Sequence, residues 1–114
     1  MKKVPTTYSA VKSRNFAKEN FGLTPMPNYT QNPYSDVQIL SGHMTPENAE
    51  NYKKALVDAG FVLEKRKWNN VPFYVHPDGA VILVGTDRQN TGRHIIDFYG
   101  DKKAKKVSNF CVYD

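Results

Sequence analysis

The most regular hydrophobic pattern of the chain lies in residues 46–59. Apolar and small side chains recur there every three or four positions, at Ala49, Tyr52, Ala55, Leu56 and Ala59. This spacing places them on one face of a helix. Thr45 and Pro46 are typical of a helix start, because a threonine oxygen accepts from a free backbone N–H and proline suits the first turn. Gly60 is typical of a helix end, so these residues predict the main helix of the fold.

Residues 61–113 alternate between β-rich runs and turn residues. Asn69-Asn70 suits a two-residue hairpin turn, and Pro77-Asp78-Gly79 suits a tight turn. The runs between the breaks predict strands at 61–68, 71–76, 80–85 and 93–99, with 107–113 as a last strand. Short turns join antiparallel neighbours. The fold class is therefore α+β, in which the main helix at about 46–59 packs on an antiparallel meander of four to five strands over about 61–113.

A short N-terminal helix is predicted within residues 8–21. Val11, Ala17 and Phe21 share a helical stripe, whereas Phe16 lies outside it. Gly22 follows as a helix end. This helix is a second, smaller element beside the main one.

The remaining N-terminal residues predict irregular or extended structure. Residues 1–7 have no periodicity and indicate a flexible start. Three prolines within residues 23–36 exclude a helix or a central strand, so this Pro/Asn/Tyr-rich segment is expected to be extended. Residues 37–40 indicate a short strand. The length of 114 residues suits one domain over residues 1–114.

Two of the predicted strands are apolar on both faces. Residues 80–85 read AVILVG, and residues 94–99 read HIIDFY. A sheet with one solvated face alternates more cleanly between apolar and polar side chains. The main helix can cover one face. We therefore expect the other face to meet the N-terminal segment, the C-terminal strand or a second copy of the chain, which gives either three-layer packing or a homodimer.

The charge distribution favours an anionic partner. The chain has 16 Lys and Arg against 11 Asp and Glu, a net charge of +5. Residues 1–50 have a net charge of +1 and residues 51–114 of +4. A basic half attracts nucleic acid, a nucleotide or an acidic protein surface, although ordinary solubilising charge explains the same excess.

Composition also indicates the compartment. No run approaches the roughly 18 apolar residues of a membrane span, and the start of the chain lacks the apolar core of a signal peptide. Cys111 is the only cysteine, and its apolar neighbours suggest a packing residue in a reducing environment. We expect a cytoplasmic protein (the host cytoplasm if the chain is viral) and no membrane partner.

The meander sorts candidate binding residues to one end of the sheet. Strand directions gather there a set of cationic, aromatic and amide side chains: Lys67, Trp68, Asn70, Arg88, Arg93 and His94. Cations beside an indole suit stacking on bases, and the glycine-bounded loop 85–92 suits phosphate binding through backbone N–H groups and arginine. The alternatives are a mobile hairpin loop and a solvated strand with its indole in the core.

The same directions separate the histidines. His76 and His94 fall at opposite ends of strands about five residues long, hence roughly 15 Å apart at ~3.3 Å per residue. His43 falls in a loop that the pattern does not place. The chain also lacks the spacing of a metal site, a P-loop or a nucleophile elbow. We therefore predict no catalytic residue, no metal site and no cofactor.

Residues 55–84 resemble a known family. They read ALVDAGFVLEKRKWNNVPFYVHPDGAVILV, which is a helix, Gly-Phe, a basic strand, an aromatic strand ending in His-Pro-Asp-Gly, and an apolar strand. This order is similar to the core of HicA-type mRNA interferase toxins, whose fold resembles a double-stranded RNA-binding domain. The family's Ser-His pair falls on Asn70 and Val71, and valine cannot transfer protons. The resemblance therefore implies a related fold or RNA binding, without RNA cleavage.

Three functions remain as hypotheses. The first is a small non-enzymatic binding protein for an anionic partner, nucleic acid or a nucleotide. The second is a phage or mobile-element accessory protein that inhibits or modulates a host protein by docking on it. The third is a small hydrolase or nuclease that uses His76 or His94.

Overall fold

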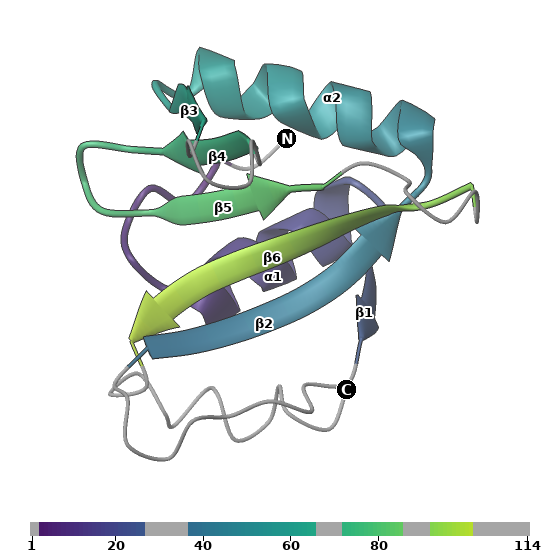
Figure 1. Cartoon of the computed structure of the whole chain (residues 1–114), viewed down its shortest axis with the longest axis horizontal. Helices are drawn as coiled ribbons and strands as arrows, with labels where there is room; N and C mark the ends of the chain where they lie inside the picture. Colours follow the sequence, from purple (N-terminus) through teal and green to yellow (C-terminus); the bar gives the residue numbers. More distant parts are fainter. Residues whose placement is uncertain (1–2, 27–36, 66–71, 86–91, 102–114) are drawn as a thin grey trace.

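The fold is described by a computed structural model that defines residues 3–26, 37–65, 72–85 and 92–101 (Figure 1). Two helices and six strands follow one another in the order α1 (Ala10–Asn20), β1 (Thr24–Met26), β2 (Val37–Met44), α2 (Pro46–Asp58), β3 (Val62–Lys65), β4 (Pro72–Val75), β5 (Val81–Val84) and β6 (His94–Asp101). The α+β class predicted from the sequence is therefore confirmed.

The six strands form one antiparallel sheet in the order β1-β2-β6-β5-β4-β3. The predicted meander is present as β3, β4, β5 and β6 in consecutive pairing. The sheet is larger than the four to five strands expected, because β2 pairs with β6 along eight residues and β1 then pairs with β2. The predicted strand at 37–40 was too short. The predicted strand at 107–113 lies outside the described residues.

Strand β1 contains a proline, Pro25, and its place at the edge of the sheet explains how a strand can include it. Pro25 lies in the edge strand, where a missing N–H costs no ladder hydrogen bond to a further neighbour. Sequence analysis assigned this part of 23–36 to an extended segment, and residues 24–26 form a three-residue strand. Residues 27–36 lie outside the described part of the chain.

Both helices begin at a side-chain cap, of which the sequence predicted the one at Thr45. The Thr45 hydroxyl accepts from the Asn48 N–H at 3.3 Å, and Pro46 occupies the first turn of α2. The Ser9 hydroxyl accepts from the Lys12 N–H at 3.2 Å at the start of α1. Side-chain acceptors of this kind satisfy donors that the first turn leaves free. The main helix is thus confirmed at Pro46–Asp58, and the short one at Ala10–Asn20.

The two helices cover the same face of the sheet. Tyr52 of α2 is 1% exposed, and its ring lies 5.2 Å from that of Phe21 and 6.4 Å from that of Phe98 in β6. Gly100 of β6 lies directly beneath the start of α1 at Ala10. These contacts join both helices and the centre of the sheet in one core. Phe16, which falls outside the sequence stripe, is also buried in this core.

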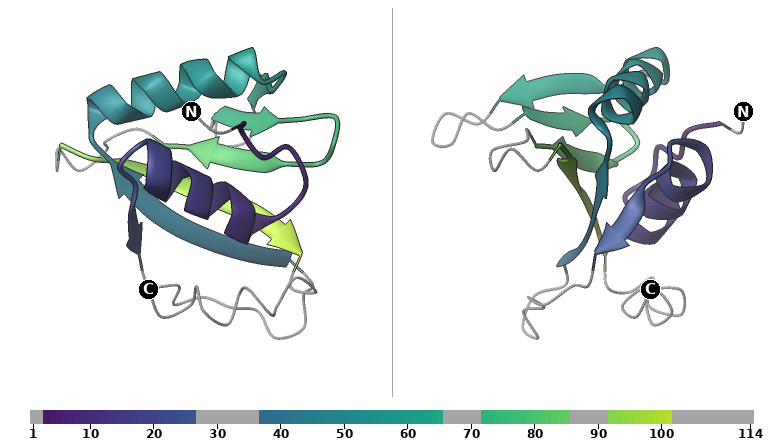
Figure 2. Two further views of the ribbon diagram at one scale, coloured as in Figure 1. Left: turned by 180° about the vertical axis from the view of Figure 1, so that it is seen from behind. Right: turned by 90° about the vertical axis from the view of Figure 1, so that its right-hand side faces the viewer.

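The opposite face has no described helix on it (Figure 2). Burial alternates along β2 and β6, with every second side chain buried towards the helices. The described elements therefore form two layers, and the three-layer packing expected from the sequence is not seen among them. The homodimer stays an untested alternative.

Residues 3–7 lie against the turn between β4 and β5, where the sequence indicates a flexible start. Val4 is buried, and the Thr6 carbonyl accepts from the Ala80 N–H at 3.0 Å. The Thr6 hydroxyl donates to Asp78 at 2.8 Å. These contacts join the beginning of the chain to the end of the sheet opposite His94.

Candidate functional site

The structure describes two of the six binding residues predicted from the sequence. Arg93 is exposed just before β6, and His94 is the first residue of that strand. The other four, Lys67, Trp68, Asn70 and Arg88, lie outside the described residues. The strand ends that flank them, Lys65, Pro72, Gly85 and Gly92, belong to described segments.

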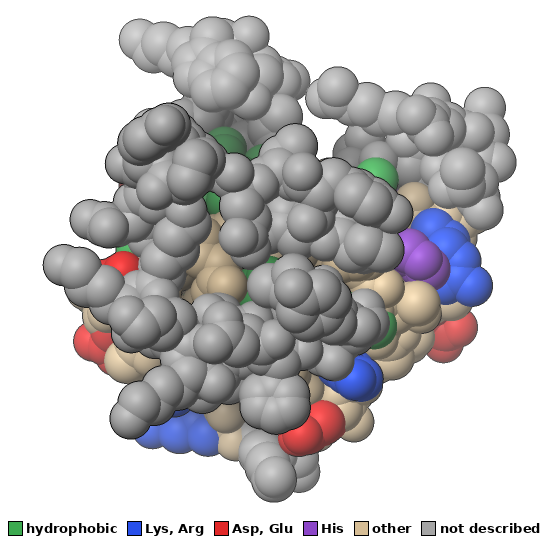
Figure 3. All heavy atoms as spheres, turned by 90° about the horizontal axis from the view of Figure 1, so that it is seen from below, with side chains coloured by type: hydrophobic (Ala, Val, Ile, Leu, Met, Phe, Trp, Pro, Cys, Tyr) green, Lys and Arg blue, Asp and Glu red, His purple; other side chains and the backbone are tan. Residues whose placement is uncertain are grey.

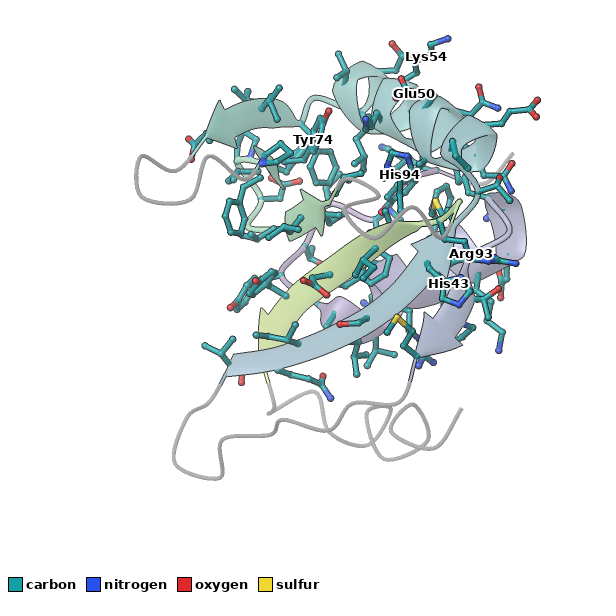
Figure 4. The ribbon with its side chains drawn as sticks, turned by 45° about the vertical axis from the view of Figure 1, so that its right-hand side comes forward. His43, Glu50, Lys54, Tyr74, Arg93 and His94 are labelled. Carbon is teal, nitrogen blue, oxygen red and sulfur yellow. The ribbon has the colours of Figure 1, made fainter. Side chains whose placement is uncertain are left out.

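Arg93 contacts a histidine that the sequence left unplaced. In the register of β2 and β6, Met44 pairs with His94 and His43 pairs with Ile95. This pairing brings Arg93 Nη1 to 3.1 Å from His43 Nδ1 (Figure 4). In the space-filling view, a histidine and basic side chains adjoin on the surface (Figure 3).

The contact defines the protonation of His43. A guanidinium group only donates hydrogen bonds, so His43 Nδ1 accepts and the ring is neutral with its proton on Nε2. Burial first, and then the positive charge of Arg93, lower the pKa of His43. At neutral pH, Arg93 therefore retains its full charge while a neutral imidazole holds it in place.

His94 is oriented by the neighbouring strand. Its Nδ1 lies 3.0 Å from the carbonyl oxygen of Gly85, which can only accept, so Nδ1 is protonated and donates. The Gly85 N–H in turn donates to the Ile95 carbonyl at 2.7 Å. The ring is thereby fixed at the junction of β5 and β6. Its other nitrogen, Nε2, has no hydrogen bond to the described part of the chain.

Helix α2 brings further charges beside His94. A single residue, Thr45, separates β2 from α2, so the first turns of the helix begin at this end of the sheet. Lys53 Nζ lies 2.9 Å from Glu50 Oε1. The hydrogen bond from Lys53, and then its charge, lower the pKa of Glu50, and the charges of His94 and Lys54 contribute further. Glu50 therefore lies within the electrostatic reach of three basic side chains.

An open pocket lies between α2 and β4. It has a volume of ≈ 440 Å³, and its lining residues are Glu50, Lys53, Lys54, Val57, Asp58 and Tyr74. Lys54 is exposed, whereas Tyr74 is largely buried in β4 beneath the helix (Figure 4). The pocket thus combines an aromatic wall with two lysines and two carboxylates. We call His43, Arg93, His94, Lys53 and Lys54 the basic end of the molecule.

His76 lies at the opposite end and has a structural role. Its Nε2 is 3.0 Å from the Ala59 carbonyl, and its Nδ1 accepts from the Asp78 N–H at 3.0 Å. Both ring nitrogens are thus engaged with backbone groups. The ring also packs edge-on against Phe61 at 5.1 Å. His76 therefore joins the end of α2 to the turn after β4.

The register keeps the two strand histidines apart. Val75, next to His76, pairs with Val81, which pairs with Tyr99 of β6. His94 lies five residues from Tyr99 along the same strand. His76 and His94 therefore lie too far apart along the sheet to form an acid–base pair.

Within the described residues, no group of three or more His, Cys, Asp or Glu side chains is arranged to hold a metal ion. None of the described helices has the length and apolar character needed to cross a membrane.

Comparison with protein-family models, curated proteins and solved structures gives no match for this chain. The resemblance of residues 55–84 to HicA-type toxins therefore depends on those residues alone. The described parts of that segment fold as the resemblance implies, with α2 followed by antiparallel β3, β4 and β5. The sheet then continues into β6, β2 and β1.

Sequence reasoning missed His43, Lys53, Lys54 and Tyr74 as site residues. The signal for His43 was the alternation of β2, which continues through Gly42 to Met44 as buried positions. Extending that strand by four residues would have placed His43 in a strand, although not beside β6. Tyr74 and the two lysines gave no such signal, because their proximity depends on how α2 lies across β4.

Proposed function

We propose that this protein is a non-enzymatic binding module for an anionic partner, and that the partner is a nucleic acid or a nucleotide. The observation that supports this most is the contact between Arg93 and neutral His43, with His94 next in sequence. It presents an exposed guanidinium group with a defined position and a full charge. Guanidinium groups bind phosphate through paired hydrogen bonds, which makes arginine well suited to this partner.

The pocket beside α2 adds a cation and an aromatic side chain to this site, and the carboxylates of Glu50 and Asp58 also line it. Lys54 offers a second cation for a phosphate, and Tyr74 offers an aromatic edge beside it. Phosphates and bases alternate along a nucleic acid strand, so a site for it needs both cations and aromatic surface. The predicted residues Lys67, Trp68, Asn70 and Arg88 belong to the two connections whose described ends lie at this end of the sheet.

Fluorescence anisotropy with labelled single-stranded RNA and DNA of about 12 nucleotides tests this function, since single-strand sites span roughly 4–16 nucleotides. At ~50 mM salt, where phosphate contacts are strongest, we expect saturable binding that weakens linearly with the logarithm of salt concentration. Arg93→Ala and Lys54→Ala should each weaken binding several-fold and reduce the salt slope by about 0.7, the value for one phosphate contact on a single strand. ATP should compete if the pocket takes a nucleotide.

Lys12→Ala is the matched control. Lys12 is an exposed lysine of α1, on the helix farther from the pocket. Its loss removes one positive charge from the molecule without touching the basic end. If binding depended on net charge alone, Arg93→Ala, Lys54→Ala and Lys12→Ala would weaken nucleic acid binding equally. That result would exclude the proposed site. Absence of binding by every RNA, DNA and nucleotide probe would exclude the function itself.

A further inference from the structure

The face of the sheet without helices is mainly apolar. Side chains of the central strands alternate, and most of those that point away from α1 and α2 have low polarity, whereas Ser41 and His43 of β2 are polar members of the same face. The side chains of low polarity are Ile39, Phe73, Val75, Val81, Leu83, Ile95 and Tyr99. Ile95 remains 45% exposed and Val37, at the beginning of β2, 42% exposed. No described helix lies over these side chains (Figures 1 and 2). We call this surface the second face.

A carboxylate lies in the middle of the second face. Asp97 of β6 pairs with Ser41 on one side and with Leu83 on the other. The Ser41 hydroxyl donates to Asp97 Oδ1 at 2.5 Å. Asp97 Oδ2 has no hydrogen bond to the described part of the chain. Burial raises the pKa of Asp97, and the Ser41 hydrogen bond opposes this only in part.

Two aromatic rings lie on the same face as this carboxylate. Tyr99 is two residues further along β6, hence on the same face, and its ring centre lies 5.9 Å from that of Phe73. Burial first, and then the negative charge of Asp97, raise the pKa of the Tyr99 phenol. The carboxylate is therefore close enough to influence the ring. Asp97, Tyr99 and Phe73 together form a partly desolvated acidic site with aromatic walls.

The charge of the second face is opposite to that of the whole chain. Three strand residues of this face are acidic, namely Glu64, Asp97 and Asp101. None of the described strand residues that point to this face is Lys or Arg, although the chain has a net charge of +5. The cation at its edge is Arg93, which precedes β6 and contacts His43 of this face. We propose that the second face binds an arginine side chain of a partner protein, presented by an extended segment with apolar neighbours.

The chemistry of the site favours arginine. A guanidinium group forms paired hydrogen bonds with a carboxylate and stacks on aromatic rings, and it is weakly hydrated. Apolar side chains on either side of it would cover Ile95 and Leu83. A second copy of this chain fits less well, because a two-fold contact across the second face would place each copy's Asp97 against the same acidic surface. Anionic lipids or phosphates would be repelled by the three carboxylates.

A peptide titration of the full-length protein tests this proposal. The probes are three acetylated and amidated pentapeptides, Val-Thr-X-Thr-Val, in which X is arginine, glutamine or glutamate. Binding is followed by the backbone amide signals of the isotope-labelled protein in NMR. We expect the arginine peptide to shift the signals of Ser41, Asp97 and Tyr99, with at least tenfold higher affinity than the glutamine peptide. The glutamate peptide should not bind.

Matched variants separate the roles of charge and ring. Asp97→Asn keeps the shape of the side chain and should abolish the preference for arginine over glutamine. Tyr99→Leu should weaken arginine binding several-fold, whereas Tyr99→Phe should retain it because the ring is kept. If Asp97→Asn unfolds the protein, the site is still tested by comparing the affinity of Tyr99→Leu for the arginine peptide with that of Tyr99→Phe.

Three results would overturn the proposal. The first is equal affinity for the arginine and glutamine peptides. The second is an arginine preference that persists in Asp97→Asn. The third is a solution mass of twice the chain mass of 13.0 kDa, together with a second face that no peptide perturbs, because this would show a second copy as the occupant.

Discussion

At the scale of single residues, the side chains of the candidate sites are held by groups that affect their charge. Arg93 is positioned by a histidine that burial keeps neutral, and His94 is oriented by the Gly85 carbonyl. The surroundings of Asp97, in contrast, disfavour its charged form. Its carboxylate lies among apolar side chains, and burial raises its pKa. Such a group opposes folding when it is charged.

Asp97→Asn should therefore change how stability depends on pH. An aspartate in an unfolded chain has a pKa of about 3.9, and that of Asp97 in the folded protein is higher. The folded state thus binds this proton more readily, so stability falls as pH rises from about 4 through the folded pKa and stays at the lower value above it. Asparagine does not titrate. We expect the Tm of Asp97→Asn, relative to that of the original protein, to rise over this window.

Circular dichroism at a series of pH values measures this difference. Ser41→Ala offers a control, because it removes the hydrogen bond that lowers the pKa of Asp97. Alone, it should destabilise the protein more at pH 7 than at pH 4. Combined with Asp97→Asn, it should lose this pH dependence. A Tm difference between Asp97→Asn and the original protein that stays constant with pH would contradict the argument.

At the scale of elements, the packing of α1 on the sheet depends on one close approach. Gly100 of β6 lies so near the backbone of Ala10 and Ser9 that an added Cβ would overlap the Ala10 nitrogen. A helix start can lie this close to a strand only where the strand has no side chain. This glycine therefore determines how α1 lies over β6.

Gly100→Ala should destabilise the protein by at least about 2 kcal/mol, since the clash is with backbone and forces the helix away. Gly92→Ala is the control. An added Cβ at Gly92 meets nothing within 4 Å, but its φ of +76° strains any other residue, by about 1 kcal/mol. Urea unfolding measures the free energy of unfolding of both variants. Equal losses in the two variants would show that backbone conformation, and not the approach of α1, explains the effect.

Elements defined by local signals could be predicted, and those defined by distant pairing could not. Thr45 and Pro46 located α2, and the turn residues located β3 to β6 to within a few positions. Strand β2 pairs with β6 across more than fifty residues of sequence, and nothing local shows that pairing. The same limit applies to the site. The meander placed Arg93 and His94 together, but His43 joins them only through β2.

At the scale of the whole molecule, two surfaces of opposite charge share one small sheet. The basic end lies at the beginning of β6, and Asp97 lies four residues after Arg93. This places their backbones about 13 Å apart at ~3.3 Å per residue. The distance exceeds the ~8–10 Å over which physiological salt screens exposed charges. From this backbone separation we expect the proposed anionic and arginine-bearing partners to bind without strong mutual influence.

This separation predicts that the two binding activities are independent in a monomer. Light scattering should give the chain mass of 13.0 kDa. Arg93→Ala should weaken RNA binding and leave the arginine peptide's affinity unchanged, and Asp97→Asn should do the reverse. In the double variant, the losses should add to within ~0.5 kcal/mol, the usual limit for sites without shared partners. A larger interaction energy would mean that the Arg93–His43 contact and Asp97 act as one site, and that the two partners compete for it.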